Sequence, residues 1–212
     1  MTEFYVPSGP GESELVEKRS RFLGHVRPVE TEEEARAFVA EMKKRFYDAR
    51  HNCWCYLLRD GVERYADDGE PQGSAGMPML ELFRREGVTN LVCVVTRYFG
   101  GVLLGTGGLS RAYAQSAKDA LADAGVSVVR RWVEASLVCS YAQLERMKQE
   151  AEGCGGVCVG TDYGAEVTLR LLLPEEEAER CRAGIFDLSG GKIELAVTGE
   201  ALRAVPAAKK KN

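Results

Sequence analysis

The sequence predicts a two-domain α+β protein. Its first half alternates strand-like and helix-like apolar patterns, and a new pattern begins at Trp132. In the second half the order of elements is β-α-β-β-α-β, which is that of a ferredoxin-like unit. A length of 212 residues suits two small domains. We place these domains at residues 1–130 and 131–206, followed by a basic tail at 207–212.

The first elements follow from apolar alternation and a helix cap. Short apolar and polar alternations within residues 13–29 predict one or two strands. Thr31 and Glu34 have the spacing of a capping box, in which each side chain binds the other residue's backbone amide. Apolar residues then recur at helical spacing, so we expect an amphipathic helix at about 32–47.

A hairpin and two further helices are predicted next. Asp60-Gly61 lies between two apolar segments and is a strong turn signal for a hairpin that ends near Ala66. Pro78 suits the first turn of a helix, and Gly87 suits its exit. The predicted elements that follow are a central strand at Leu91–Val95 covered on both faces and an alanine-rich helix that ends at Gly125.

The second domain continues with short elements of both kinds. Trp132–Cys139 alternates like a strand. The predicted elements that follow are a helix capped by Ser140 and Gln143, strands near 157–162 and 165–173, an acidic helix opened by Pro174, Glu175, Glu176 and Glu177, and a last strand with Ile193, Leu195 and Val197.

Composition predicts a cytoplasmic globular protein. The chain is 45% hydrophobic and 28% charged, which is ordinary for a domain that folds without a metal or disulfide. Its seven cysteines are odd in number and scattered, and several lie in apolar runs, so we expect small buried hydrophobes in a reducing compartment. The N-terminus has no secretory pattern, and no apolar run approaches the roughly 20 residues that span a bilayer.

The charge balance restricts any nucleic-acid hypothesis. The formal net charge is −4, so the chain has no global field that attracts a polyanion. Contact with RNA would need a local basic patch. Lys209, Lys210 and Lys211 can contribute to one, but a solvated tail is the simpler interpretation.

The most informative segment is the glycine-rich stretch Arg97–Arg111, between the buried strand and the alanine-rich helix. Its glycines permit close backbone approach, and free amides with the Thr106 hydroxyl at the helix start can bind an anion. Arg97 and Arg111 can add forked hydrogen bonds to a phosphate or carboxylate. The segment is neither a Walker A loop nor a Rossmann fingerprint. A tight crossover, whose glycines only permit packing, remains the alternative.

An acidic turn precedes the helix at Pro78. Asp67, Asp68 and Glu70 place three carboxylates within four residues, which can bind a hard cation, a basic partner or the arginines of the same domain. The spacing is not that of an EF-hand, and a solvated turn is the simpler interpretation.

His51 stands beside two cysteines in the segment His51-Asn52-Cys53-Trp54-Cys55. Cys53 and Cys55 share one face of a strand and no second ligand pair has zinc spacing, so we expect core packing for both thiols. His51 lies at the strand edge, where it can serve a surface site or cap the strand entry.

Together these segments resemble the YigZ/IMPACT family over about residues 15–125. The matching pieces, in family order, are Lys18-Arg19-Ser20-Arg21-Phe22, His51-Asn52-Cys53-Trp54, Asp67-Asp68-Gly69-Glu70-Pro71, Ala75-Gly76-Met77-Pro78, and Arg97-Tyr98-Phe99-Gly100-Gly101 through Gly105-Thr106-Gly107-Gly108-Leu109 to Arg111-Ala112-Tyr113. Cys55 stands where the family usually has alanine, and Ser74 where it usually has threonine. The second half resembles the smaller C-terminal domain of bacterial members.

The resemblance implies a first domain like the βαβ domains of ribosomal proteins and translation factors, and a second like the ferredoxin-like domains of elongation factor G. It favours a non-enzymatic, translation-associated protein that contacts RNA, the ribosome or a translation-related protein. A small-molecule enzyme or a protein that binds a small anionic ligand is one alternative, and recognition of a basic protein by the acidic turn is another. No cofactor, metal or catalytic residue is assigned. The residues predicted to form the binding surface are His51, Asn52, Asp67, Asp68, Glu70, Arg97, Tyr98, Gly100, Gly101, Gly105, Thr106, Gly107, Gly108 and Arg111.

Overall fold

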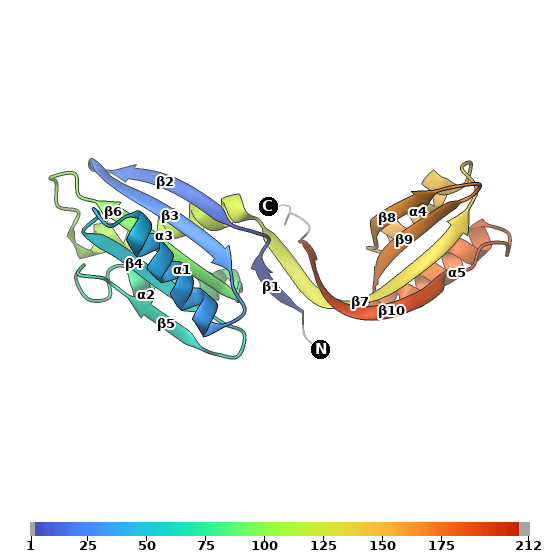
Figure 1. Cartoon of the computed structure of the whole chain (residues 1–212), viewed down its shortest axis with the longest axis horizontal. Helices are drawn as coiled ribbons and strands as arrows, with labels where there is room; N and C mark the ends of the chain where they lie inside the picture. Colours follow the sequence, from blue (N-terminus) through green and yellow to red (C-terminus); the bar gives the residue numbers. More distant parts are fainter. Residues whose placement is uncertain (1–2, 208–212) are drawn as a thin grey trace. The chain divides into compact units, whose positions relative to one another are not determined.

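The computed structural model describes residues 3–207 and divides into two compact units (Figure 1). Among the described residues, the N-terminal unit is Phe4–Val128 with residues 204–207, and the C-terminal unit is Val129–Arg203 with residue 3. No helix in the described part of the chain is both long and apolar enough to cross a membrane. The lysines of the expected basic tail lie outside the described residues.

The N-terminal unit is built on a five-stranded sheet in the order β2-β3-β6-β4-β5, in which all neighbouring strands are antiparallel. Its strands are β2 (Gly11–Glu17), β3 (Ser20–Pro28), β4 (His51–Leu57), β5 (Glu63–Ala66) and β6 (Leu91–Tyr98). Both β3 and β4 are antiparallel to β6, so they are parallel to each other and form a βαβ crossover around it. The α+β class and the βαβ core are therefore confirmed.

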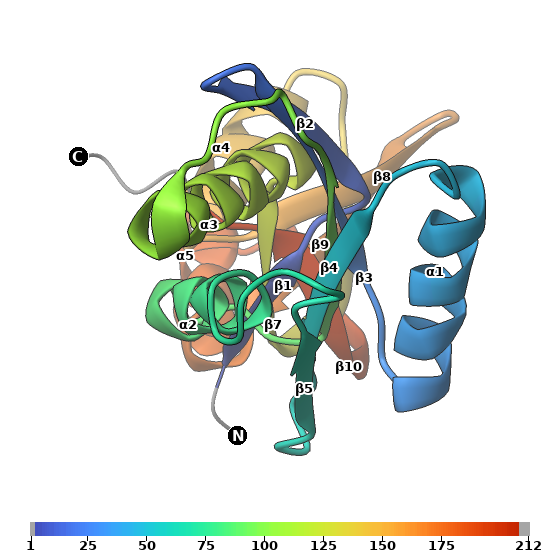
Figure 2. The same cartoon turned by 90° about the vertical axis from the view of Figure 1, so that its left-hand side faces the viewer.

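Helices cover both faces of this sheet (Figure 2). One face carries α1 (Glu32–Arg45), and the other carries α2 (Gly76–Glu86) and α3 (Gly105–Ala124). The capping box is confirmed, because the Thr31 hydroxyl accepts a hydrogen bond from the Glu34 amide at 3.2 Å while the Glu34 carboxylate accepts from the Thr31 amide. Leu91–Val95 is fully buried, as a strand covered on both faces must be.

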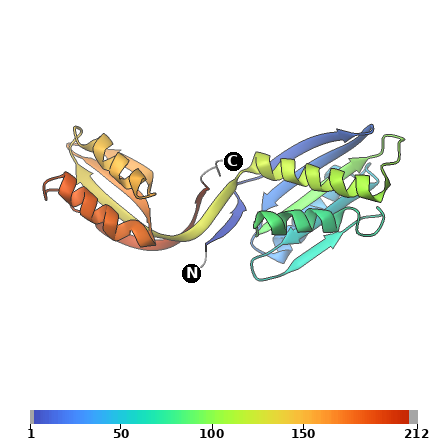
Figure 3. The same ribbon diagram turned by 180° about the vertical axis from the view of Figure 1, so that it is seen from behind.

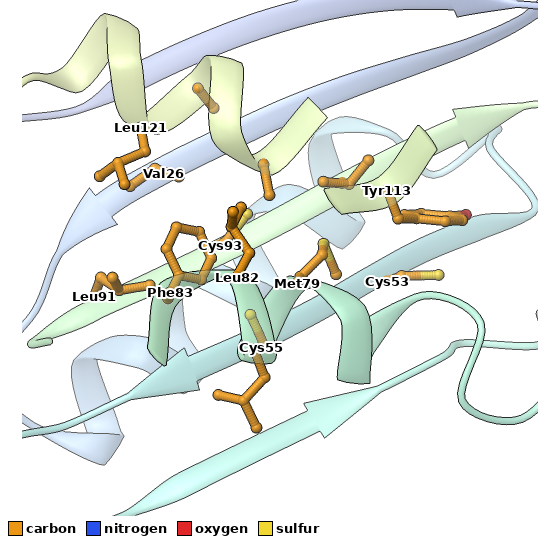
Figure 4. Close-up of a cluster of buried hydrophobic side chains, with 14 of the residues drawn as sticks. Val26, Cys53, Cys55, Met79, Leu82, Phe83, Leu91, Cys93, Tyr113 and Leu121 are labelled. Carbon is orange, nitrogen blue, oxygen red and sulfur yellow. The ribbon is translucent and has the colours of Figure 1, made fainter. Parts of the chain in front are cut away.

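The larger core lies between the sheet and the pair α2 and α3 (Figure 4). Cys53, Cys55 and Cys93 are fully buried in it beside Phe83, and burying such an aromatic side chain contributes about 1.5–3 kcal/mol. Burial raises the pKa of the Cys53 and Cys93 thiols well above the ordinary range. The prediction that these cysteines pack as small hydrophobes is confirmed.

The C-terminal unit has the ferredoxin-like order of strands, β10-β7-β9-β8, over one core shared by two helices. Its elements are β7 (Val126–Cys139), α4 (Leu144–Gly153), β8 (Val157–Tyr163), β9 (Val167–Pro174), the 3-10 turn η1 (Glu175–Glu177), α5 (Ala178–Leu188) and β10 (Ala196–Pro206). The short strand β1 (Phe4–Pro7), which belongs to the N-terminal unit, was not predicted. The expected β-α-β-β-α-β order is confirmed.

Several predicted boundaries in the second half are wrong. β7 begins earlier than expected, at Val126, because Gly125 ends the preceding helix with φ 69° and the chain extends at once. Ile193 and Leu195 are buried but precede β10, so their alternation reflects anchoring to the core before the strand begins. No side chain caps the first amides of α4; the side-chain oxygen Oε1 of Gln143 instead accepts from the Ser140 hydroxyl at 2.8 Å and from the Ser140 amide at 3.2 Å.

Candidate functional site

Arg97, at the end of β6, is sealed into the N-terminal unit. Its side chain is 6% exposed, and one guanidinium nitrogen (Nη1) lies 2.7 Å from Oε1 of Glu70, whose side chain is 4% exposed. The Tyr113 hydroxyl donates to the same oxygen at 2.8 Å, and Nη2 of Arg97 donates to the Ser20 hydroxyl. The prediction that Arg97 faces an external anion is therefore wrong, because a buried carboxylate already neutralises it.

Asp67, the first residue of the acidic turn, organises the start of α2. Its carboxylate accepts hydrogen bonds from the backbone amides of Gly73, Ala75 and Gly76 at 2.8–3.0 Å. Amides at the start of a helix have no partner within the helix, and a carboxylate there is stabilised by the helix dipole. Asp67 thus does for α2 what a capping side chain does, although it precedes the helix by several residues.

Asp68 and the His51 segment are joined by further hydrogen bonds. The Asp68 carboxylate accepts from Lys43 at 2.6 Å and from the backbone amide of Asn52 at 2.8 Å. His51 donates through Nδ1 to the Asp68 carbonyl oxygen at 2.9 Å, and Thr96 donates to the Asn52 side chain at 2.7 Å. With the Glu70–Arg97 pair, the structure therefore brings five predicted site residues together, but their polar groups hold the acidic turn against β4 and β6. The five are His51, Asn52, Asp68, Glu70 and Arg97.

This arrangement leaves the acidic turn little capacity for other ligands. Within residues 3–207, no three side chains of the metal-binding types are grouped so as to hold an ion. The Asp67 carboxylate already has three donors and that of Glu70 has two, and Asp68 is paired with Lys43. The turn is thus a structural element, and its expected role in meeting a basic partner is not supported by this geometry.

Two positions in the glycine-rich segment require glycine for structural reasons. A Cβ atom on Gly100 would lie 2.0 Å from the carbonyl carbon of Arg19, because the segment crosses the β2–β3 turn at close range. Gly105 has φ +70° where α3 begins, a conformation that costs other residues strain. Beside them, the Tyr98 hydroxyl donates to Asp48, and Gly101 is exposed. The crossover interpretation therefore holds for part of the segment.

The remaining predicted site residues of the segment lie at or near the surface. Thr106, Gly107 and Arg111 are exposed and Gly108 is half-buried, all within the first turns of α3. No side chain caps this helix, and its first turn contains no acidic residue. Arg111 lies along that turn, with its guanidinium 3.7 Å from where a Cβ atom on Gly107 would be. Of the two arginines, only Arg111 can meet an external ligand.

Arg111 borders a hollow of about 700 Å³ beside α3, which we call the basic hollow. Four exposed basic side chains and two acidic ones line it, together with apolar and small residues. The lining residues are Leu15, Glu17, Lys18, Leu82, Arg85, Glu86, Leu104, Gly108, Arg111, Ala112, Ala114, Gln115 and Lys118. Among the described residues, none of its four cations has a carboxylate partner within ion-pair distance.

Sequence reasoning missed most of the basic hollow. Lys18 belongs to one of the recognised segments but was not assigned to the binding surface, and Arg85 and Lys118 carry no local motif. Arg111 and Lys118 are seven residues apart on α3, so helical spacing could have placed them on one face. Only the packing of α3 against β2 and α2 brings Lys18 and Arg85 to that face.

Comparisons with known proteins agree with this architecture. The model of the Impact N-terminal domain matches residues 18–121, and that of a domain of unknown function (DUF1949) matches residues 137–192. A YigZ protein of Escherichia coli, described as an IMPACT family member, is 35% identical over 92% of this chain and 98% of its own length. The chain belongs to the IMPACT family.

Other IMPACT family relatives differ in how much of the chain they match. The YvyE protein of Bacillus subtilis is 33% identical over 91% of this chain and 89% of its own length. The mouse protein IMPACT is 32% identical over 43% of this chain and 30% of its own length. A solved structure described as a hypothetical protein has a TM-score of 0.59 and 33% identity, covering 94% of this chain and 98% of that one. The two-domain form is therefore shared with bacterial relatives.

Proposed function

We propose that this IMPACT family member is a non-enzymatic, translation-associated binding protein of the cytoplasm that contacts the ribosome or its RNA through the basic hollow. The observation that carries the proposal is the gathering of four cations, Lys18, Arg85, Arg111 and Lys118, that have no ion-pair partner among the described residues, in a protein whose net charge is −4. Family resemblance supports the link to translation. The amides at the start of α3 add a second feature that favours an anionic partner.

The electrostatic attraction of these four cations acts over a short distance, which suits a local contact. The Debye length is about 8 Å at physiological ionic strength, so distant acidic groups weaken the field of the hollow only slightly. Glu17 and Glu86 in the same lining offset part of the attraction, but the four cations leave the hollow with a net positive charge. The association should therefore depend steeply on salt, even though the whole chain is acidic.

The chemistry of the described groups favours binding over catalysis. The Cys53 thiol is buried in the core with a raised pKa, which disfavours the reactive thiolate. Asp67 and Glu70 are held in structural hydrogen bonds, and the basic hollow is lined mainly by cations and apolar groups. These features support a surface that recognises a partner.

A small anionic ligand is the alternative that the size of the hollow favours, because pockets for small molecules typically measure 300–1,000 Å³. Thermal shift assays with nucleotides and phosphorylated metabolites test it. An increase in melting temperature that Arg111→Glu abolishes would support this alternative. The absence of any shift across the panel would count against it.

The decisive experiment is co-sedimentation of the full chain with purified ribosomes over a range of salt concentrations. Arg111→Glu should weaken the association at least about tenfold, because it replaces one attraction by a repulsion. Arg50→Glu is the matched control, since Arg50 is exposed and lies outside the hollow. A wild-type chain that fails to sediment with ribosomes at low salt would overturn the proposed function.

A further inference from the structure

The floor of the basic hollow is apolar. Leu15 and Leu104 are partly buried and pack on the larger core, and Leu82 is 5% exposed within it. Ala112 and Ala114 continue this surface along α3. A site built only for phosphates has no use for a leucine floor, because phosphate groups cannot remove apolar surface from water.

The hollow is elongated along α3. Leu104, Gly108, Arg111, Gln115 and Lys118 are lining residues spaced three or four positions apart, so they follow one stripe of the helix. At 1.5 Å per residue, this stripe is about 21 Å long. α2 lies on the same side of the sheet as α3, and both face the viewer in Figure 3. The dimensions match about four turns of a second helix laid in a groove.

We propose that the basic hollow is a docking groove for an acidic amphipathic helix of a protein partner, a refinement that rests on the proposed function. Apolar side chains of that helix cover the partly exposed Leu15 and Leu104, and its carboxylates meet the four cations at the rim. Burial supplies about 25 cal/mol for each Å² of apolar surface removed from water. Charge complementarity sets the choice of partner and the rate of association.

RNA fits the lining of the groove less well. No aromatic side chain is among the described residues that line it, so unpaired bases have no stacking platform there. A phosphate backbone would leave the leucine floor uncovered. Glu17 and Glu86 lie in the same lining and would repel phosphates, whereas a peptide can place an amide or a hydroxyl beside them.

Ala114→Phe separates the two kinds of partner, because it fills the groove and leaves every charge in place. Ala114 is half-buried in the lining of the hollow, whereas Ala122 is an exposed alanine on the same helix outside it. Ala122→Phe therefore serves as the matched control for the loss of helix propensity. Thermal melting establishes that both variants are folded.

The probe is a labelled helical peptide of about 14 residues, with leucines at helical spacing and glutamates on both flanks. Binding to the full chain is measured by fluorescence anisotropy. A scrambled peptide of the same composition and an RNA duplex of similar length are the comparison probes. We expect the helical peptide to bind at least about tenfold more tightly than the scrambled one. Ala114→Phe should remove that difference, and Ala122→Phe should preserve it.

The ribosome assay distinguishes failure of this inference from failure of the proposed function. If the groove docks a protein helix, Ala114→Phe weakens ribosome association at least about tenfold, and excess duplex RNA does not compete. Three results together would overturn the helix proposal while the proposed function stands: duplex RNA competes with the ribosome, Ala114→Phe has no effect on the association, and the helical peptide binds no better than the scrambled one. If the wild-type chain does not associate with ribosomes at all, the proposed function itself fails.

Discussion

Arg97 and Arg111 stand at the two ends of one glycine-rich segment, yet they have opposite roles. Arg97 is 6% exposed and pairs with a buried carboxylate, whereas Arg111 is exposed and pairs with no described residue. The difference shows that residue type and motif membership do not decide what an arginine does. The presence of an internal carboxylate partner decides it: the first arginine holds the fold together, and the second remains available for binding.

The largest expected effect comes from breaking the buried pair. Arg97→Met leaves the Glu70 carboxylate without its cation in a site that water does not reach, and such a loss costs about 3–5 kcal/mol of folding free energy. Arg111→Met should change stability by less than about 0.5 kcal/mol, since it removes an exposed group without a partner. Native-state hydrogen exchange of the β6 amides measures both variants in this unit.

A second substitution tests whether that cost reflects an unpaired charge. Arg97→Met combined with Glu70→Leu removes both partners and should recover most of the lost stability. Equal stability of Arg97→Met and Arg111→Met would contradict the distinction between the two arginines.

The acidic turn should show an intermediate effect. In Asp67→Asn one carboxylate oxygen becomes an amide group that cannot accept, so at least one amide among Gly73, Ala75 and Gly76 loses its acceptor. The expected cost is about 1–3 kcal/mol, read from urea unfolding. Glu86→Gln is the control, because this exposed carboxylate lines the hollow and has no such amides. A loss of stability no larger than that of the control would contradict the structural role of the turn and favour a role in binding.

The smallest expected effect is on the pH dependence of stability and comes from His25, a buried side chain with one ring nitrogen that lacks a described hydrogen-bond partner. His25 is 6% exposed, stacks on Phe46, and has a ring nitrogen, Nε2, without a described partner. Burial lowers its pKa; nearby Arg45 acts in the same direction, and Glu12 opposes both. Below pH 6.5 the unfolded chain therefore binds more protons at this position than the folded chain.

The sign of the pH dependence follows from that difference. His25 makes no pH-dependent contribution well above pH 6.5, where the ring is neutral in both states. Stability should fall as the pH decreases from about 6.5 towards the lower folded-state pKa, and His25→Gln should reduce this slope. Urea unfolding at a series of pH values measures it. An unchanged slope in His25→Gln would show that other groups cause the decline.

Local chemistry explains why much of the fold was predictable. The capping box at Thr31 and the apolar run Leu91–Val95 each fix an element through neighbouring residues alone. The ferredoxin-like order followed from the succession of such elements. Burial of the cysteines followed from their apolar surroundings, and it is confirmed for all but Cys158, which is half-buried.

The candidate site was less predictable because its properties depend on long-range packing. Pairing of the acidic turn with an arginine of the same domain was one of the open alternatives, but Glu70 and Arg97 are 27 positions apart and neither segment shows that these two residues meet or that their pair is buried. The basic hollow draws Lys18 from a turn, Arg85 from α2 and Lys118 from α3. Sequence reasoning found the conspicuous glycines and acidic residues, most of which build the scaffold.

The most direct test compares two double variants that lower the net charge equally. Arg85→Gln/Arg111→Gln removes two cations of the basic hollow, and Lys44→Gln/Arg50→Gln removes two exposed cations that lie outside it. Thermal melting first establishes that the two variants are equally stable. Co-sedimentation with ribosomes over a range of salt concentrations then measures the affinity of each. The first variant should lose at least about tenfold in affinity and show a shallower salt dependence, while the second should bind as wild type. Equal losses in both variants would contradict the assignment of binding to the hollow.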